Sequence, residues 1–551
     1  MGRGLSGPSL RALGLALPLG LALMLSSGGA QARECATLRM LEAARAGQLS
    51  SPLAALQVRP PSVGFVDSGR FPIRVHYPSE PLAERADVLL GVVEDSWQRQ
   101  VEDQGYPRPL PDQGEGGDDR FDVYIGLTAP AVALTLAHED VDDADGRHAS
   151  YAHVVVDPSL EGDDLAPFVH HELAHAIQFG MDLEESLMFF EASAVAQEYF
   201  LDRELGFPTL SWASDVDDFQ AFPSAAPFTN GIDLYFIVGG DRLYEYGAAL
   251  FLLYLEEEHG EGDGALLRRL WEASVQPDDV EENEPDWLDA VEEELDGDLA
   301  SAVLDFATWR ALVSTWAVED DGLPGAAALP GTALLGTRRL LASALDGAPL
   351  LIGEAEQPQQ LGCFTFETTA ISSLGVPLVV TAESPVAGDD AAPRPIGISW
   401  LVGSPDEGRA ARGVHGAVGE KLTLSLSLQR GETGLVAVCD LGPADADDEP
   451  APRDLRVRVR RADLEIPDGG VADDASDGGR YVIPAAPGCS CQGAPAPPRG
   501  GPFARARPLA FLGMTAVGLL LFFVRARRVS RRKKLYEQGR SRERTPGSLD
   551  S

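Results

Sequence analysis

Two histidines and a glutamate lie close together in the segment VHHELAHAIQFG, residues 169–180. His171, Glu172 and His175 match the pattern H-E-x-x-H. Because helical residues four positions apart share a face, the two imidazoles can bind one metal ion. Glu172 lies about 100° further around the helix, where it can take a proton from a water molecule that the metal activates. The motif predicts one catalytic zinc ion, Zn²⁺.

The residues around the motif favour a helix over residues 164–179. Asp163 and Pro167 are typical of a helix start, and Gly180 is typical of a helix end. The other positions of this segment are mostly apolar, so two histidines and a glutamate would be costly to bury there without a binding partner. The sequence shows no other cluster of histidines, so we expect a single metal centre.

A third metal ligand is expected from a following helix. Metzincins place a glycine and a histidine three and six positions after the second histidine, but this chain has Gln178 and Met181 there, which excludes that class. Gluzincins instead use a glutamate from the next helix. Glu191, in LMFFEASAVAQEYF, fits this position, and fifteen residues separate it from His175. Glu184 and Glu185, in a predicted turn, are the alternative ligands.

Other polar residues near the motif have less certain roles. Glu198 lies two helical turns beyond Glu191, so it either supports a ligand or lies on the helix surface. His170 is out of phase with the two ligand histidines, and we expect it either to support a ligand or to be structural. The acidic run 138–147 suggests Ca²⁺, but Ala144 occupies a ligand position of the EF-hand pattern, so we favour a solvated loop.

These motifs resemble those of the gluzincin metallopeptidases. HELAHAIQ followed by FFEASAVAQE is similar to their pairing of HExxH with a W-x-x-E-G-x-A helix, especially in the zinc aminopeptidase branch. The segment YEYGAALFLLYLEEEHG, which starts at Tyr244, resembles the Y-E-x-G helix of that branch. The chain looks most like uncharacterised secreted metalloproteases of myxobacteria, over about residues 35–320. The resemblance implies a zincin-like fold and hydrolysis of peptide bonds.

The resemblance also implies a role for each matching residue. Glu172 matches the general base, and Tyr244 matches the phenol that stabilises the oxyanion, with Tyr246 as the alternative. The residues that match the zinc ligands are His171, His175 and Glu191. Ala192 replaces the glycine that follows the ligand glutamate, and the G-x-M-E-N exopeptidase motif is missing, so aminopeptidase specificity is not implied. A non-catalytic zinc-binding adhesion protein and a zinc amidase acting on cell-wall peptides are the alternative functions.

The two ends of the chain predict export and membrane anchoring. Residues 1–32 have a charged start, an apolar run and the sequence Ala-Gln-Ala, which together indicate a signal peptide. Residues 508–524 form an uncharged run long enough to cross a bilayer, and the basic cluster RARRVSRRKK follows at once. The positive-inside rule places the basic tail, 525–551, in the cytoplasm and the body of the protein outside.

A cysteine motif precedes the predicted membrane helix. The segment GCSCQGAPAPPRGG, with Cys489 and Cys491, resembles the C-terminal sorting tails of myxobacterial surface proteins, in which processing at the cysteine exchanges the helix for a lipid anchor. The chain departs from that pattern because it continues to Ser551. A retained single membrane span is therefore the alternative anchor.

Charge excludes one class of partner. Residues 1–500 carry 32 Lys and Arg against 83 Asp and Glu, whereas residues 501–551 carry 12 against three. Residues 1–500 are so acidic that they would repel the phosphate backbone of a nucleic acid. We therefore expect no nucleic-acid partner. The expected partners are a peptide or protein substrate and, through the C-terminal helix or a lipid, a membrane.

The sequence pattern predicts an α+β zincin-like metallopeptidase domain, residues 33–325, followed by an all-β sandwich domain, residues 335–465. Helices are expected at 35–57, 82–104, 164–179 and over most of 187–316, and strands at 71–77, 121–127 and 151–157. We expect 151–157 to be the strand nearest the active-site cleft. Beyond Pro330, short alternating apolar segments predict six to eight strands, among which Cys363 and Cys439 can pair. Residues 466–507 are rich in Pro, Gly and Asp, which indicates a stalk.

Overall fold

The computed structural model combines helices with several β-sheets. It describes residues 59–128, 131–138, 149–205, 213–227, 244–277, 283–318, 322–329, 336–341, 345–353, 356–370, 376–384, 395–404, 409–419, 421–446 and 454–462. The chain divides into two compact units, 1–468 and 469–551, and all described residues belong to the first. The expected signal peptide, first helix, acidic run, stalk, cysteine motif and membrane helix lie outside the described residues.

A five-stranded sheet lies at the N-terminal end of the described chain, with strand order β1-β2-β3-β5-β4. The strands β2, β3 and β5 are parallel to one another, and β1 and β4 are antiparallel to their neighbours. The strands are β1 (Gly64–Asp67), β2 (Ile73–Tyr77), β3 (Phe121–Ile125), β4 (Ala133–Ala137) and β5 (Ala152–Val156). The central strands are buried along their whole length, as expected for a sheet that is covered on both faces.

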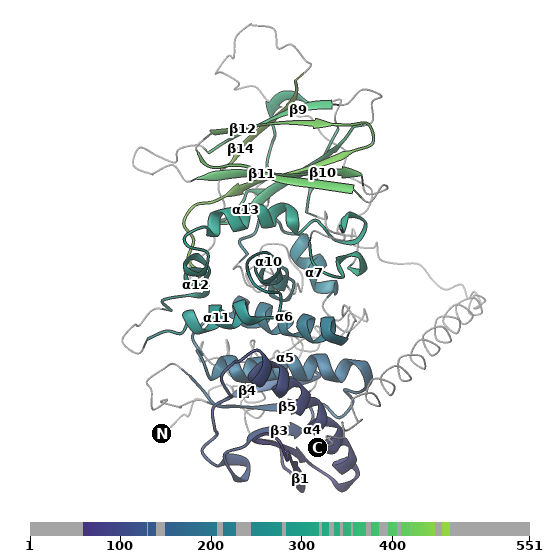
Figure 1. Cartoon of the computed structure of the whole chain (residues 1–551), viewed down its shortest axis with the longest axis vertical. Coiled ribbons are helices and arrows are strands. Elements are labelled where there is room, and N and C mark those ends of the chain that lie inside the picture. Colours follow the sequence, from purple (N-terminus) through teal and green to yellow (C-terminus); the bar gives the residue numbers. More distant parts are fainter. Residues whose placement is uncertain are drawn as a thin grey trace, which may run out of the picture. The chain divides into compact units, whose positions relative to one another are not determined.

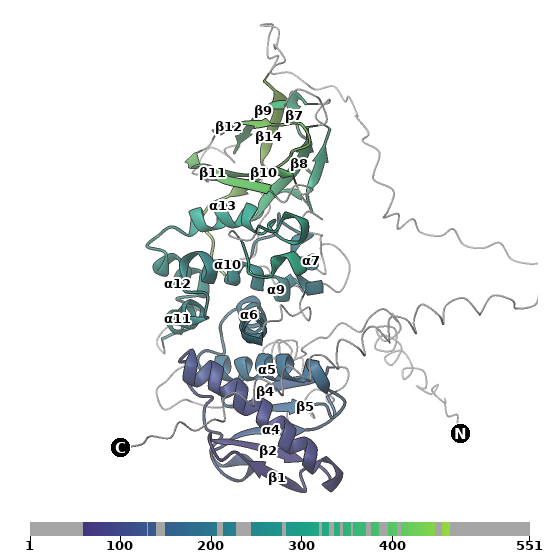
Figure 2. The ribbon, with the colours of Figure 1, turned by 45° about the vertical axis from the view of Figure 1, so that its right-hand side comes forward.

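Helices α4 (Ala83–Trp97) and α5 (Leu165–Phe179) cover one face of this sheet (Figure 2). Helix α4 continues into a π-helical turn, Gln98–Asp103. The next helix, α6 (Leu187–Leu205), packs on α5. Helix α5 thus lies between the sheet and α6, so residues on opposite sides of α5 face different neighbours.

The remaining helices surround α10 (Ala249–His259), which is seen end-on in Figure 1. Its apolar sequence ALFLLYL has no polar face, which is why it is buried on all sides. The other helices are α7 (Ala213–Gln220), α9 (Tyr244–Gly247), α11 (Ala265–Ala273), α12 (Trp287–Glu294) and α13 (Leu299–Trp309). Short 3-10 turns are Glu80–Leu82, Glu115–Gly117, Gly162–Asp164, Ser314–Trp316 and Ala326–Ala328.

Two mainly antiparallel sheets, which follow the helices in the sequence, form a sandwich. Their strand orders are β11-β10-β13-β8-β6 and β12-β9-β14-β7. The strands are β6 (Arg338–Leu340), β7 (Asp346–Pro349), β8 (Cys363–Thr369), β9 (Val376–Glu383), β10 (Ile396–Ser404), β11 (Arg409–Gly419), β12 (Lys421–Leu428), β13 (Thr433–Asp440) and β14 (Arg456–Arg461). Alternate side chains of β9 and β12 point into the sandwich core, as their sequence pattern predicts.

The structure pairs Cys363 with Cys439 in a disulfide between the neighbouring strands β8 and β13. Helix α13 packs against β10, β11 and β13, on the face of their sheet that points away from the sandwich core. Leu401, Leu435 and Leu441 of the sandwich therefore belong to the same apolar core as the helices.

One expectation about the sheet was wrong. The segment 151–157 contains β5, but β5 lies inside the sheet, and β4 forms the edge beside it. Strand β4 was not predicted, because its sequence ALTLA has few of the β-branched and aromatic residues that mark the other strands of the sheet. Among the described residues, no helix is both long and apolar enough to span a bilayer.

Asp286 gives a test of how the helices and the sandwich are joined. Its carboxylate accepts hydrogen bonds from the backbone nitrogens of Asp289, at the start of α12, and Ala446, after β13. We expect Asp286→Ala to lower the free energy of unfolding by about 1–3 kcal/mol, because a helix cap and a buried acceptor are both lost. Urea unfolding of the full-length chain measures this change.

Asp298→Ala is the matched control, since Asp298 precedes α13 and its exposed side chain makes no capping hydrogen bond. Its cost should stay below about 0.5 kcal/mol. Equal losses in the two variants would contradict the role given to Asp286.

Candidate metal centre

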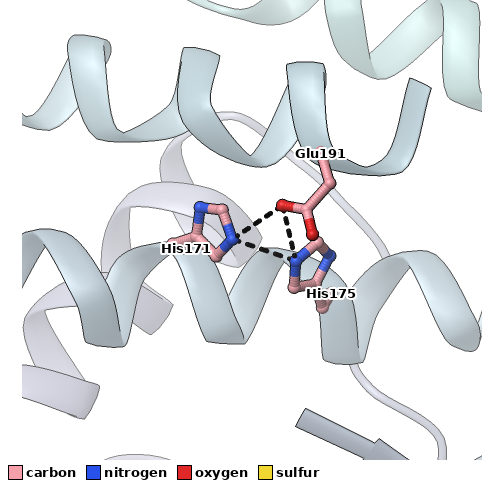
Figure 3. Close-up of side chains that lie close together, drawn as sticks. All are labelled: His171, His175 and Glu191. Carbon is pink, nitrogen blue, oxygen red and sulfur yellow. Dashed lines mark hydrogen bonds and ion pairs between the residues drawn. The ribbon is translucent and has the colours of Figure 1, made fainter. Parts of the chain in front are cut away.

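Helices α5 and α6 bring together the three residues that the sequence predicts as metal ligands. His171 and His175 project from α5, and Glu191 reaches towards them from α6 (Figure 3). The Nε2 atoms of the two histidines are 3.0 Å apart. Glu191 Oε2 lies 3.2 Å from Nε2 of His171 and 3.5 Å from Nε2 of His175. Within the described chain, this is the group of His, Cys, Asp and Glu side chains whose geometry could hold a metal ion.

The three side chains are almost completely buried, with exposed fractions of 2% for His171, 0% for His175 and 2% for Glu191. A bound cation would keep the Glu191 carboxylate in the ionised form that a metal ligand requires.

A chain of hydrogen bonds fixes which nitrogen of His175 carries the proton. Trp271 Nε1 and Gln178 Nε2 both donate to Ser193 Oγ, at 3.0 and 2.8 Å. Because the Gln178 amide nitrogen is used in this way, its oxygen faces His175 and can only accept. His175 Nδ1 therefore donates to Gln178 Oε1, at 2.8 Å. The ring is left with its lone pair on Nε2.

Glu198 fixes the other histidine in the same way. Its Oε1 lies 2.9 Å from Nδ1 of His171, and the side chain is buried. Since a carboxylate only accepts hydrogen bonds, Nδ1 of His171 carries the proton and Nε2 carries the lone pair. This contact favours a role for Glu198 in support of a ligand over a place on the helix surface.

The resulting arrangement fits a zinc ion. Two imidazole lone pairs and one carboxylate face a common point, and without a cation they would repel one another. Zinc–nitrogen bonds are about 2.0–2.1 Å long, which places two nitrogens of a tetrahedral site about 3.3 Å apart. The observed separation of 3.0 Å is close to this value. Two imidazoles and a carboxylate are also the protein ligand set of many catalytic zinc sites.

Glu172 faces the sheet on the side of the edge strand. Its carboxylate Oε2 accepts a hydrogen bond of 2.7 Å from Oγ1 of Thr135, in the middle of β4, and the same hydroxyl lies 2.8 Å from the Glu172 carbonyl oxygen. The Glu172 side chain is fully buried. Thr135 therefore holds the predicted general base, and β4 connects it to the sheet.

The two tyrosines of α9 face different surroundings. The ring of Tyr246 lies parallel to that of His171, with 6.0 Å between centroids. The hydroxyl of Tyr244 instead donates to the carbonyl oxygen of Ala226 at 3.0 Å, and its ring packs on Phe219. Of the two candidates, Tyr246 is the one that lies beside the metal ligands, whereas Tyr244 points towards α7.

The alternative ligands lie elsewhere. Glu185 is buried, which raises its pKa to about 8, and its carboxylate accepts from the Ser186 backbone nitrogen. Neither Glu184 nor Glu185 belongs to the ligand group. His170 is buried as well, and burial lowers its pKa to about 3, so it is neutral at neutral pH.

A second set of histidines lies on the opposite face of the N-terminal sheet, which corrects the expectation of a single cluster. His138 Nε2 is 2.8 Å from His153 Nδ1, and His76 Nε2 is 2.9 Å from Asp122 Oδ1. The strands β2, β3 and β5, with the residue that follows β4, bring these residues together from distant parts of the sequence. The geometry of this set does not meet the requirement for three converging metal ligands.

Several residues of the centre could not be found by sequence reasoning. Gln178 and Ser193 lie next to predicted ligands, but nothing in their spacing indicates that they join α5 to α6. Thr135 and Trp271 come from β4 and α11, and only the tertiary structure brings them to the site.

Comparisons with known proteins add little. No family model matches the chain, and no curated protein matches it. Among solved structures, the pre-peptidase C-terminal domain of a collagenase from Bacillus anthracis matches 22% of this chain and 94% of that domain, with 12% identity and a TM-score of 0.14. A likeness of this strength carries no argument about the function of the chain.

The ligand geometry predicts how zinc binding responds to substitution. Glu191→Ala should remove most of the bound zinc, because a direct ligand is lost. Glu198→Ala and Gln178→Leu should keep zinc at about 10–100-fold lower affinity, because each loses only the hydrogen bond that orients a ligand. Zinc stoichiometry and competition with a chromogenic chelator measure these effects. If Glu198→Ala lost zinc while Glu191→Ala retained it, the ligand would be Glu198.

Proposed function

We propose that this protein is an exported, surface-tethered zinc metallopeptidase that hydrolyses peptide bonds. The observation that carries the proposal is the convergence of His171 Nε2, His175 Nε2 and Glu191 Oε2 on one point, with Glu172 beside them on α5. When bound there, zinc would polarise the scissile carbonyl and acidify a water molecule. The resemblance of the motifs to those of gluzincins supports the same reaction.

The chain's own residues supply the other parts of this reaction. Glu172 takes the proton from the attacking water and later gives it to the leaving amine. Thr135 of β4 binds the carboxylate of Glu172 through its hydroxyl and so fixes the orientation of this side chain. The phenol of Tyr246, next to His171, donates a hydrogen bond to the oxygen on which negative charge develops. These roles need no further charged group.

The edge strand suggests how a substrate is held. Strand β4 pairs with β5 alone among the described strands, and its Thr135 contacts the general base. An extended peptide can add to a sheet edge through backbone hydrogen bonds, and β4 takes the place first expected for 151–157. Because the metal ligands are at most 2% exposed, we expect short extended peptides to be better substrates than folded proteins.

Substitution of Glu172 tests the mechanism. Glu172→Gln should keep full zinc content but lower the rate of peptide hydrolysis by at least about 10²–10⁴-fold, because the general base is removed. Hydrolysis of a mixed peptide library by the zinc-loaded protein, with a chelator-treated sample for comparison, gives the rate and the cleavage sites. A Glu172→Gln variant that kept wild-type turnover would refute the mechanism. Cleavage of peptidoglycan in place of peptides would favour a cell-wall amidase, and no cleavage of either would favour an adhesion protein.

The two tyrosines provide an internal control. Tyr246→Phe should lower the rate of hydrolysis, but by less than Glu172→Gln, because the metal still stabilises the oxyanion. Tyr244→Phe should leave the rate within about twofold, since its hydroxyl is bound to Ala226. The reverse order would assign the catalytic role to Tyr244.

The position on the cell surface rests on the sequence of the two ends. If the sorting-tail resemblance holds, mass spectrometry of the mature protein should find a C-terminus near Cys489 or Cys491 that carries lipid. A mature chain that ends at Ser551 would instead indicate a retained membrane span.

A further inference from the structure

Arg310, which follows α13, is a buried cation at the junction of the helices and the sandwich. Only 8% of its surface is exposed. Its Nε donates to Gln220 Oε1 at 2.5 Å, and its Nη2 donates to the Phe219 carbonyl oxygen at 2.8 Å. The guanidinium carbon also lies 4.0 Å from the ring centroid of Phe219. All of these partners are uncharged.

No carboxylate in the described part of the chain pairs with Arg310, which sets it apart from the buried Arg74 and the partly buried Arg59. Arg74, 6% exposed, lies 2.6 Å from Asp67, and Arg59 lies 2.7 Å from Asp112. Burial lowers the pKa of Arg310 to about 10, so the group remains protonated at neutral pH. A buried charge without a counter-ion is costly, and proteins normally pair it.

A small cavity lies next to this guanidinium. Its volume is about 20 Å³, and its lining includes Arg310, Tyr244 and Thr365, with apolar side chains around them. The Tyr244 hydroxyl donates to the Ala226 carbonyl oxygen, and the Thr365 hydroxyl shares a hydrogen bond with that of Thr337. The two hydrogen bonds of Arg310 use Nε and Nη2, and no hydrogen bond from Nη1 to a described residue is found. The donors of Nη1 are therefore the polar groups available to an occupant.

We infer that this cavity binds a single monatomic anion, chloride, against the guanidinium of Arg310. The cavity is small, about 20 Å³, so it favours a compact anion over a large organic one. Water would fill the space but would leave the buried charge uncompensated, whereas chloride supplies the missing counter-ion. The inference does not depend on the proposed peptidase activity.

The anion would contact both the helices and the β-sandwich. Its cavity is lined by Phe219 of α7, Tyr244 of α9, Phe306 of α13 and Thr365 of β8. Since α9 also carries Tyr246, the anion would stabilise the short helix whose other side packs beside His171.

Thermal unfolding at constant ionic strength tests the site. Sodium chloride replaces sodium gluconate stepwise around the full-length protein, because gluconate is too large for the cavity. We expect a saturable rise of the unfolding temperature by at least about 2 °C, since an ion that binds only the folded state stabilises it. Formate serves as a small carboxylate for comparison. A response to formate equal to that of chloride, or no saturable response to chloride, would overturn the inference.

Two further measurements separate this site from general salt effects. Arg310→Met should lose the saturable chloride response, whereas Arg74→Met, which removes a buried arginine with its own carboxylate partners, should keep it. In crystals of the wild-type protein soaked in bromide, an anomalous peak should lie within hydrogen-bonding distance of the Arg310 guanidinium. The absence of that peak would refute the site even if Arg310→Met failed to fold.

Discussion

The repulsion between two imidazole lone pairs and a carboxylate, enclosed in an apolar core, is the constraint on which the site depends. His171 and His175 are held with their Nε2 atoms facing each other, because their Nδ1 protons are bound by Glu198 and Gln178. Such an arrangement is unfavourable unless a cation occupies the point between them. The hydrogen bonds that Trp271 and Gln178 donate to Ser193 hold the arrangement in place, so part of the surrounding structure serves to oppose this repulsion.

Some features of the structure depend on short stretches of sequence and others on tertiary contacts, and this difference explains what the sequence could predict. His171 and His175 follow from helical spacing alone, and the α+β opening and the sandwich follow from their apolar periods. These features are local, so a short window of sequence contains the whole signal. The strand pairing that brings Cys363 beside Cys439 was within reach only because both cysteines lie in recognisable strands.

The predictions that needed tertiary information were weaker. Tyr244 and Tyr246 lie on one turn of helix and point to different sides, and only the docking of α9 decides which ring packs beside His171. Strand β4 has few β-branched or aromatic residues, so the identity of the edge strand, and with it the role of Thr135, could not be foreseen. The histidines on the far face of the sheet likewise meet only after β2, β3 and β5 have paired.

The placement of all three ligands on one helical hairpin has a consequence for folding. Glu191 follows His171 by about twenty residues, so α5 and α6 can bring the ligands together through contacts of low sequence separation, which form early and cost little loop entropy. The partners of Glu172 and Ser193, on β4 and α11, join only when the sheet and the later helices have assembled. If the proposed centre binds a metal ion, a partly folded chain could therefore capture that ion before the rest of the site is assembled, and the bound ion would then guide the remaining folding steps.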